Sequence, residues 1–290
     1  MPTPERNSSS VAVRVGREVA LLDCGEGTQR QMVAAHIGFN RVKNIFISHL
    51  HGDHVLGLPG LIQSMGLQRR DEILNIYGPR GIQNFIDCIS KTLGDPIFPV
   101  NVQELHKSGI ICDQRSYFIE AVNSDHSIEG WSYSLSEKMK PGRFHPENAI
   151  KLGIPKGILW KQLQDGNDIF FDGKIIKSIE VVDPPRSGRK IVYSGDTRPN
   201  DALIELSTSV SLLIHEATFD DDLMDRAAED GHSTFTQAAR IAKIASVKRL
   251  IITHISSRYS DPSLILRVVK GIFEKADIAY DLLEIIVPPT

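Results

Sequence analysis

The hexapeptide His49-Leu50-His51-Gly52-Asp53-His54 is the most informative stretch of the sequence, and it follows a run over residues 43–48 whose centre is the apolar segment Ile45-Phe46-Ile47. Four of its six residues have side chains that bind metals, and packing alone does not explain such crowding. On an extended segment, imidazoles at positions i and i+2 point to the same side, and the turn that Gly52 permits brings Asp53 and His54 to a second position nearby. Histidine and carboxylate groups at close spacing are typical of zinc sites, so this segment is expected to supply ligands to two metal ions. A single histidine at a strand end would instead indicate a hydrogen-bonded structural residue.

Short apolar runs alternate along the chain with longer segments of helical spacing. The runs predict strands at 43–48, 117–122, 190–194, 212–214 and 249–253, and the longer segments predict helices at 55–67, 81–93, 234–245 and 263–275. This alternation indicates an α/β protein with a sheet at its centre. Because one α/β domain can reach this length, we expect a single domain over residues 1–290. The stretch at about 139–173 is rich in Pro, Gly and Lys, and we expect it to leave the core as an arm.

Three further candidate ligands follow the predicted strands: His126, Asp196 and His254. In α/β sheets, sites assemble where strands end and loops converge. Each of these residues alone would be interpreted as a turn or capping residue. With the hexapeptide they make five histidines and two aspartates, which is enough for two metal ions if one aspartate bridges them and each ion keeps a position for solvent or substrate.

The composition excludes several classes of protein. A net charge of −3 argues against a protein that coats nucleic acid without specificity, because such binding needs many Lys and Arg contacts to phosphates. No apolar run approaches the ~20 residues of a membrane span, and the first residues lack the pattern of a secretory signal, so we expect a cytoplasmic protein with no membrane partner. Cys24, Cys88 and Cys112 are widely spaced and odd in number, so we expect them to be reduced.

Basic residues gather in the expected arm. Between residues 138 and 161, Glu147 alone opposes Lys138, Lys140, Arg143, Lys151, Lys156 and Lys161. This cluster is either a solvated loop or a surface that contacts phosphates.

Beyond the hexapeptide, several segments occur in an order that is specific to one family. They are Pro2-Thr3-Pro4-Glu5-Arg6-Asn7, Leu22-Asp23-Cys24-Gly25-Glu26-Gly27-Thr28, His54-Val55-Leu56-Gly57-Leu58-Pro59-Gly60, Gly195-Asp196-Thr197-Arg198-Pro199, His215-Glu216-Ala217-Thr218-Phe219, Gly231-His232-Ser233-Thr234 and Thr253-His254-Ile255-Ser256-Ser257-Arg258-Tyr259. Together they span nearly the whole chain and resemble the ribonuclease Z family of the metallo-β-lactamase superfamily. The resemblance implies the metallo-β-lactamase fold, an α/β αββα four-layer sandwich of two mixed sheets with outer helices.

The resemblance also implies a role for each candidate ligand. One zinc would be held by His49, His51 and His126, the other by Asp53, His54 and His254, with Asp196 between them. Two Zn²⁺ per subunit are expected, with Mn²⁺ as the alternative metal. Asp53 would accept the proton of the attacking water.

A second pair of residues would move the other proton. By resemblance, His232, oriented by Glu216, would protonate the departing ribose oxygen. The structural alternatives are a neighbour of a helix cap for His232 and a carboxylate in a surface ion pair for Glu216.

The activity that the resemblance implies is removal of the 3′ trailer from precursor tRNA, which leaves a tRNA 3′-hydroxyl and a 5′-phosphate on the trailer. The implied substrate contacts are Arg6, Asn7, Arg258, Lys140 and Arg143. The partners expected are precursor tRNA and a second copy of the chain in a homodimer, with no DNA. Relatives begin with a strand and a turn ahead of the Pro2–Asn7 loop, so that edge strand is expected to be missing or to lie upstream of the first residue.

Two other functions are compatible with the same ligands. A small-molecule hydrolase, such as a phosphodiesterase, lactonase or thioesterase, would not need the basic arm. A non-catalytic RNA-binding or scaffold protein would not need seven candidate ligands. Cleavage of a tRNA that carries a 3′ trailer separates the first alternative from a ribonuclease, and bound zinc separates the second.

Overall fold

The computed structural model describes residues 3–4, 6–139 and 141–289, which form two compact units. Unit 1 comprises residues 1–136 and 190–287, and unit 2 comprises 137–189 with the last residues of the chain. Unit 2 therefore includes the whole of the segment 139–173 that the sequence marks as an arm and continues 16 residues beyond it, to Arg189.

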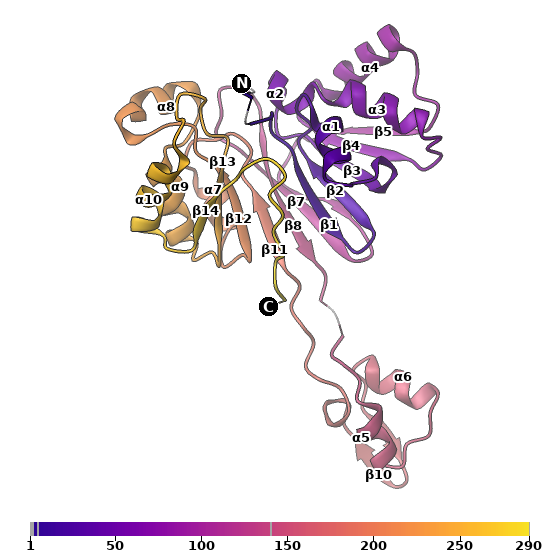
Figure 1. Ribbon diagram of the computed structural model, residues 1–290. Helices are drawn as coiled ribbons and strands as arrows, with labels where there is room; N and C mark the ends of the chain where they lie inside the picture. The colour runs from indigo at the N-terminus through magenta and orange to yellow at the C-terminus, as the bar shows by residue number, and fades with distance from the viewer. Residues whose placement is uncertain (1–2, 5, 140, 290) are drawn as a thin grey trace. The chain divides into compact units, whose positions relative to one another are not determined.

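Unit 1 is built on two sheets that face each other (Figure 1). The first sheet has the order β1 (Val11–Val15), β2 (Glu18–Leu22), β3 (Val42–Phe46), β4 (Leu74–Gly78) and β5 (Val100–Glu104). The second has the order β14 (Ala276–Ile278), β13 (Leu250–Thr253), β12 (Leu212–Glu216), β11 (Lys190–Tyr193), β8 (Trp131–Glu137), β7 (Tyr117–Asn123) and β6 (Gly109–Asp113). Both sheets are mixed: strands β2 to β5 run parallel beside antiparallel β1, and β11 to β14 run parallel beside antiparallel β8.

Helices cover the outer face of each sheet. Those of the first half are α1 (Thr28–Ala34), α2 (Gly52–Val55), α3 (Leu58–Leu67) and α4 (Ile82–Leu93), and those of the second half are α7 (Asp201–Leu206), α8 (Met224–Asp230), α9 (Phe235–Ile244) and α10 (Pro262–Ile272). Helix α9 begins at a capping box, in which Thr234 and Gln237 each accept the other's backbone N–H.

Three apolar clusters separate the four layers. The first packs α1, α3 and α4 on the first sheet, and the second packs α7, α9 and α10 on the other sheet. The third lies between the sheets, where Phe46 and Tyr77 of the first sheet meet Tyr133 and Tyr193 of the second. Each sheet thus buries both of its faces, and the αββα sandwich implied by the resemblance is confirmed.

Unit 2 has a small core of its own. It contains α5 (Pro146–Lys151), α6 (Ile158–Gln164) and a hairpin of β9 (Ile169–Phe171) and β10 (Lys174–Ile176). Its buried apolar residues include Ile154, Leu163 and Val181, against which Trp160 packs. Its two helices have six and seven residues, which is too short to give the sequence a clear helical repeat.

All five predicted strands are present, but the helix predicted at 55–67 is wrong in one respect. The chain forms α2 and α3 with a break at Gly57, whose N–H donates to Cys24 O. A Cβ at Gly57 would lie 2.1 Å from Gly25 O, so the backbones approach more closely than any side chain allows. Helix α3 then begins at Leu58, and Pro59 at its second position fits the first turn of a helix.

Two wider properties follow from the described residues. None of the helices combines the length and the apolar character that crossing a lipid bilayer requires. The three cysteines are unpaired, as predicted, with Cys24 and Cys112 buried and Cys88 exposed.

Candidate metal centre

The candidate metal-binding side chains lie where strands of both sheets end. The hexapeptide follows β3 and continues into α2, which turns Asp53 and His54 away from His49 and His51. From the second sheet come His126 after β7, Asp196 after β11 and His254 after β13. Strands β11, β12 and β13 are parallel neighbours, so their carboxyl ends deliver residues to one edge.

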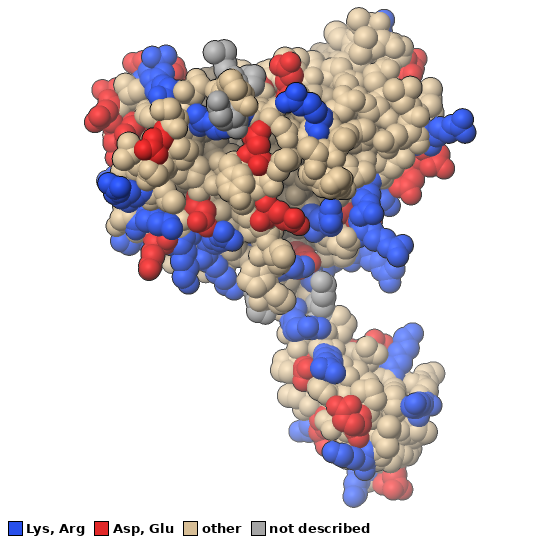
Figure 2. Space-filling view, in the orientation of Figure 1, with Lys and Arg blue, Asp and Glu red and all other residues tan. Residues whose placement is uncertain are grey.

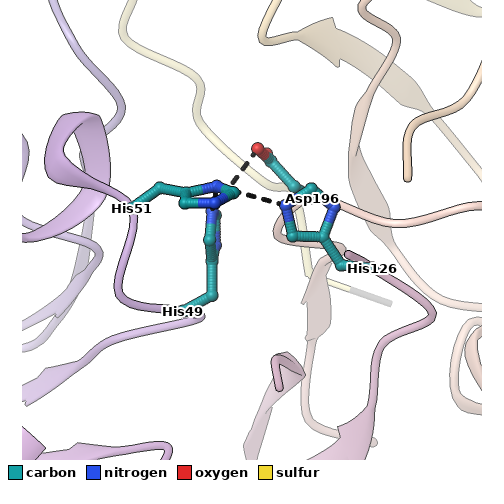
Figure 3. Close-up of side chains that lie close together, drawn as sticks. All are labelled: His49, His51, His126 and Asp196. Carbon is teal, nitrogen blue, oxygen red and sulfur yellow. Dashed lines mark hydrogen bonds and ion pairs between the residues drawn. The ribbon is translucent and has the colours of Figure 1, made fainter. Parts of the chain in front are cut away.

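The first group of ligands comprises His49, His51, His126 and Asp196, which turn toward one point (Figure 3). His51 Nδ1 lies 3.0 Å from His49 Nε2 and 3.2 Å from His126 Nε2. Asp196 Oδ2 lies 3.6 Å from His49 Nε2. Three imidazole nitrogens and one carboxylate oxygen therefore surround a common centre.

The second group comprises Asp53, His54 and His254, with Asp196 beside it. Asp196 Oδ2 is 3.4 Å from both His54 Nε2 and His254 Nε2, and Asp53 Oδ2 is 3.4 Å from His254 Nε2. A single oxygen of Asp196 thus contacts imidazoles of both groups, which is the geometry of a bridging ligand.

The donor set fits divalent metal ions. Tetrahedral nitrogen ligands about 2.05 Å from a zinc ion lie about 3.3 Å from one another, and the separations within the first group are 3.0 to 3.6 Å. Among the described residues, the buried atoms His54 Nε2 and Asp196 Oδ1 have no hydrogen-bond partner. Buried polar atoms are rarely left in this state, and a cation would satisfy both.

The outward-facing nitrogens of four of these histidines are fixed by the protein. His49 Nδ1 contacts Ser48 Oγ at 2.9 Å, His126 Nδ1 donates to Gly231 O at 2.7 Å, and His254 Nδ1 contacts Thr218 Oγ1 at 2.9 Å. His54 Nδ1 donates to Asp23 Oδ2 at 2.7 Å. Such contacts set the tautomer and the ring orientation of a metal ligand.

Burial and charge prepare the ligands for a cation. Burial, with a smaller effect of His54, lowers the pKa of His49 to about 2, and burial also lowers the pKa of His51 and His126. A hydrogen bond from His254 holds the pKa of Asp53 well below its usual range. The imidazoles of the first group are therefore neutral at pH 7, and Asp53 is ionised.

His54 and Asp196 shift each other's pKa in opposite directions. Burial opposes protonation of His54, but the carboxylates of Asp196 and Asp23 outweigh it and raise the His54 pKa. Burial likewise opposes ionisation of Asp196, and the adjacent His254 and His54 outweigh it and lower the Asp196 pKa. A metal ion bound here would take the place of the proton on His54.

Glu216 and His232 lie beside the two groups. His232 Nδ1 is 3.1 Å from Glu216 Oε1, and the Glu216 carboxylate also accepts from the backbone N–H groups of Thr197, Thr218 and Ser233. Burial opposes protonation of His232, but Glu216 outweighs it and raises the pKa of His232. His232 Nδ1 is 3.9 Å from Asp196 Oδ2, so it is closer to Glu216 than to the bridging oxygen.

The expected substrate contacts are placed differently from one another. Arg6 donates to the carbonyls of Ile255, Ser256 and Tyr259, and so braces the loop that follows His254. Asn7 is held by the carboxylate of Asp281 through its backbone N–H and its amide group.

The remaining expected contacts are more open. Arg258 is exposed, and its guanidinium lies 5.1 Å from the centre of the Phe219 ring, which packs against His232. Arg143 is exposed in unit 2, and Lys140 lies outside the described residues.

Asp23 is a residue of the site that the sequence analysis did not single out. It is fully buried and accepts from Ser48 N, Ser48 Oγ, His54 Nδ1 and Tyr193 OH at 2.6 to 2.8 Å. Its backbone has φ of 59°, a left-handed conformation that costs a residue with a Cβ about 1 kcal/mol. The available signal was its position, because it is a carboxylate directly after the apolar run Glu18–Leu22.

Comparison with known proteins gives full-length matches. The ribonuclease Z of Methanosarcina mazei is 44% identical over 290 aligned residues, which cover 99% of this chain and 95% of that protein. The ribonuclease Z of Methanothermobacter thermautotrophicus is 44% identical over 289 residues, with 98% and 92% covered. The chain belongs to the ribonuclease Z family.

A solved structure also resembles the whole chain, and further matches concern the fold or parts of the chain. The human tRNase Z, short form, superimposes with a TM-score of 0.73 at 30% identity over 99% of this chain and 95% of that one. The metallo-β-lactamase fold protein YhfI of Bacillus subtilis has a TM-score of 0.68 at 18% identity, with 97% and 91% covered, and shares the fold. Residues 3–95 match the profile of the anti-Pycsar protein Apyc1, and residues 179–255 match the β-lactamase superfamily domain.

The contacts of Asp23 make its replacement a test of the centre. Asp23→Asn replaces one carboxylate oxygen with an NH₂ group. In one orientation of the amide this group faces the Ser48 N–H, and in the other it faces the N–H of His54. We expect the free energy of unfolding to fall by at least about 2 kcal/mol in urea titrations, because a buried donor is left unsatisfied. We also expect zinc to bind about 10–100-fold more weakly in competition with a chelator, since His54 loses its orienting partner.

The matched control is Asp95→Asn, which changes an exposed aspartate. It should leave both quantities unchanged. Equal zinc affinity in Asp23→Asn and the unaltered protein would contradict the role given to Asp23.

Proposed function

We propose that this chain is a metal-dependent endoribonuclease that acts in the cytoplasm and removes the 3′ trailer from precursor tRNA. The products would be a tRNA with a 3′-hydroxyl and a trailer with a 5′-phosphate. One observation supports this proposal most strongly: a chain of the ribonuclease Z family brings all seven expected ligand side chains together from four separate segments.

Two zinc ions, with manganese as the alternative, are the metals that we propose for the centre. His49, His51 and His126 would hold one ion, Asp53, His54 and His254 the other, and Asp196 would bridge them. Such a pair of ions lowers the pKa of a bound water toward ~7 and stabilises the charge that builds on phosphate oxygens.

Two side chains of this protein would move the protons. Asp53 is partly exposed and ionised, so its carboxylate is placed to accept the proton of the attacking water. His232 is held at Nδ1 by Glu216, which leaves Nε2 to donate a proton to the departing ribose 3′ oxygen. Because the Glu216 carboxylate raises the pKa of His232, the imidazole can carry that proton near neutral pH.

The basic side chains around the centre would position the RNA. Arg258 is exposed over Phe219 and within reach of a phosphate beside His232. Arg6 and Asn7 would shape the border of the cleavage site through the loops that they brace, and Arg143 and Lys140 would contact the tRNA from unit 2. Contacts of this kind position a nucleic acid without reading its sequence.

Mapping the cut on a precursor tRNA tests the proposal directly. We expect cleavage just after the discriminator base, with loss of activity after chelation and recovery on addition of Zn²⁺ or Mn²⁺. Asp53→Ala should abolish turnover, because it removes both a metal ligand and the proton acceptor. Hydrolysis of small phosphodiesters, lactones or thioesters without any cut in the tRNA would instead favour a small-molecule hydrolase.

The role of His232 can be separated from that of the metals by the choice of leaving group. In His232→Ala, we expect cleavage of precursor tRNA to slow by about 10²–10⁴-fold, the usual contribution of a general acid. A substrate that releases p-nitrophenolate, such as bis(p-nitrophenyl) phosphate, needs no proton on its leaving group and should slow much less. Equal losses on the two substrates would contradict a proton-donor role.

Unit 2 is the part of the chain that we propose to grip the tRNA body. It carries ten Lys or Arg against seven Asp or Glu, although the chain as a whole has a net charge of −3. Figure 2 shows Lys and Arg side chains scattered over the face of unit 2 that it draws, with fewer Asp and Glu side chains among them. A cationic surface of this kind suits phosphates.

The strands that flank unit 2 permit a clean deletion. Ser136 of β8 and Lys190 of β11 are direct register partners, so residues 137–189 can be replaced by an Asn-Gly turn that closes a hairpin. We expect this variant to keep its thermal unfolding transition and its activity on bis(p-nitrophenyl) phosphate, and to lose at least about 10-fold in kcat/KM on precursor tRNA. Equal loss on both substrates would contradict the proposed role of unit 2.

We also propose that the chain is a homodimer in which unit 2 of one subunit serves the metal centre of the other. The resemblance to the family supports this arrangement. Mixing the unit 2 deletion with Asp53→Ala tests this arrangement. The deletion keeps an intact metal centre but lacks unit 2, whereas Asp53→Ala keeps unit 2 but lacks a working centre. Activity on precursor tRNA should appear on mixing, and an inactive mixture that light scattering shows to contain mixed dimers would contradict it.

A further inference from the structure

Helix α8 leads into the turn that carries His232, yet it is thinly packed. Of its seven residues only Ala227 is buried. The helix ends at Gly231, whose left-handed φ of 84° starts the turn, and His232 N then donates to Ala227 O. Apolar burial therefore does little to fix the position of α8, the helix that precedes His232.

The guanidinium group of Arg198 makes hydrogen bonds that hold α8 where apolar packing is sparse. Arg198 Nε donates to Ala228 O, and Arg198 Nη2 donates to Glu229 O at 3.3 Å. These carbonyls belong to the last turn of α8, where intrahelical partners are missing and the helix dipole is negative. A cation at this position both satisfies the carbonyls and complements the dipole.

The same guanidinium reaches the loop of a metal ligand. Arg198 Nη1 lies 3.0 Å from Asp125 Oδ1, and Arg198 N donates to Asp125 O at 2.7 Å. Asp125 precedes His126, and Arg198 itself stands two residues after Asp196. Three loops that supply the centre, those of His126, Asp196 and His232, therefore meet at one side chain.

A close backbone contact links two of these loops directly. Gly231 O accepts from His126 Nδ1 at 2.7 Å. A Cβ at Gly231 would lie 2.6 Å from Ser127 N and 2.7 Å from His126 Nδ1, so the turn and the ligand loop touch without room for a side chain. Movement of α8 would consequently move the carbonyl that orients His126.

We propose that Arg198 is a positioning residue that clamps α8 to the Asp125–His126 loop and so fixes His126 and His232 relative to Asp196. The role rests on the proposed function, in which His126 binds a metal and His232 donates a proton. Arg198 acts through these two histidines and has no need to touch the RNA. Lysine cannot replace it, because the clamp needs several N–H donors in a planar fork that reaches three acceptors at once.

Steady-state kinetics on precursor tRNA test the clamp. We expect Arg198→Ala and Arg198→Lys to lower kcat about 10–100-fold while KM stays within about threefold, as for loss of a partner that orients a metal ligand. Added guanidinium at millimolar concentration should restore part of the activity of Arg198→Ala. The matched control is Arg240→Ala, which removes an exposed arginine of α9 and should change neither constant.

A direct RNA contact predicts a different result. It would raise KM, leave kcat unchanged and make binding less dependent on salt. That pattern in Arg198→Ala would overturn the proposal.

A second readout does not depend on nuclease activity. Titration of the metal-free protein with Co²⁺, followed by visible absorption, reports how His126 and its neighbours bind a metal. We expect Arg198→Ala to weaken Co²⁺ binding and to alter the spectrum, and Arg240→Ala to match the unaltered protein. Unchanged Co²⁺ binding in Arg198→Ala would contradict the clamp even if no tRNA were cleaved, whereas failure on tRNA alone would contradict the proposed function.

A milder variant covers the case in which Arg198→Ala does not fold. Asp125→Asn keeps the shape of the side chain and one acceptor but removes its charge. We expect smaller changes in the same direction in kcat and in Co²⁺ affinity, with an unchanged circular dichroism spectrum. The absence of any change in both measurements would count against the clamp.

Discussion

One carboxylate oxygen joins the two halves of the candidate metal centre. Asp196 Oδ2 lies 3.4 to 3.6 Å from imidazole nitrogens of His49, His54 and His254, which come from both sheets. That convergence requires β3 of the first sheet and β11 to β13 of the second to end at the same edge of the sandwich. The tight packing of aromatic side chains between the sheets sets that alignment, because a shift of either sheet would separate the two halves of the centre.

A layer of polar residues behind the ligands gives the centre its rigidity. Asp23 accepts a hydrogen bond from His54 of the hexapeptide. Glu216 contacts His232 and also accepts from three backbone N–H groups. Thr218 Oγ1 stands between Glu216, His232 and His254, at 2.9 to 3.2 Å from each. In a region with little water these hydrogen bonds are stronger than at the surface. Removal of one partner leaves a buried polar group without a hydrogen bond, which lowers the stability.

The sequence predicted those parts of the structure that are encoded locally. The hexapeptide contains its own spacing and turn, and each apolar run ends beside a residue that the structure brings to the site. The fold could be predicted because a family resemblance supplied the long-range order, and the same resemblance selected the candidate ligands that the structure brings close together. The sheet pairings by themselves could not be read from the runs.

The features that the sequence did not predict depend on contacts between segments that lie far apart in the chain. Asp23 meets Tyr193 across 170 positions, and Arg6 meets the loop after His254 across about 250. The pattern of residue types along the chain does not indicate which distant residues will be in contact. The break at Gly57 escaped for the same reason, because the backbone that excludes a side chain there belongs to Cys24 and Gly25.

The pairing of Ser136 with Lys190 has a consequence for how such proteins diversify. The chain leaves the sheet and re-enters it between two partners that would be neighbours in a plain hairpin. A segment inserted between these two residues can therefore differ in size and shape while the pairing of β8 with β11 stays the same. Recognition of new substrates can evolve at this junction while the hydrolytic chemistry is inherited unchanged.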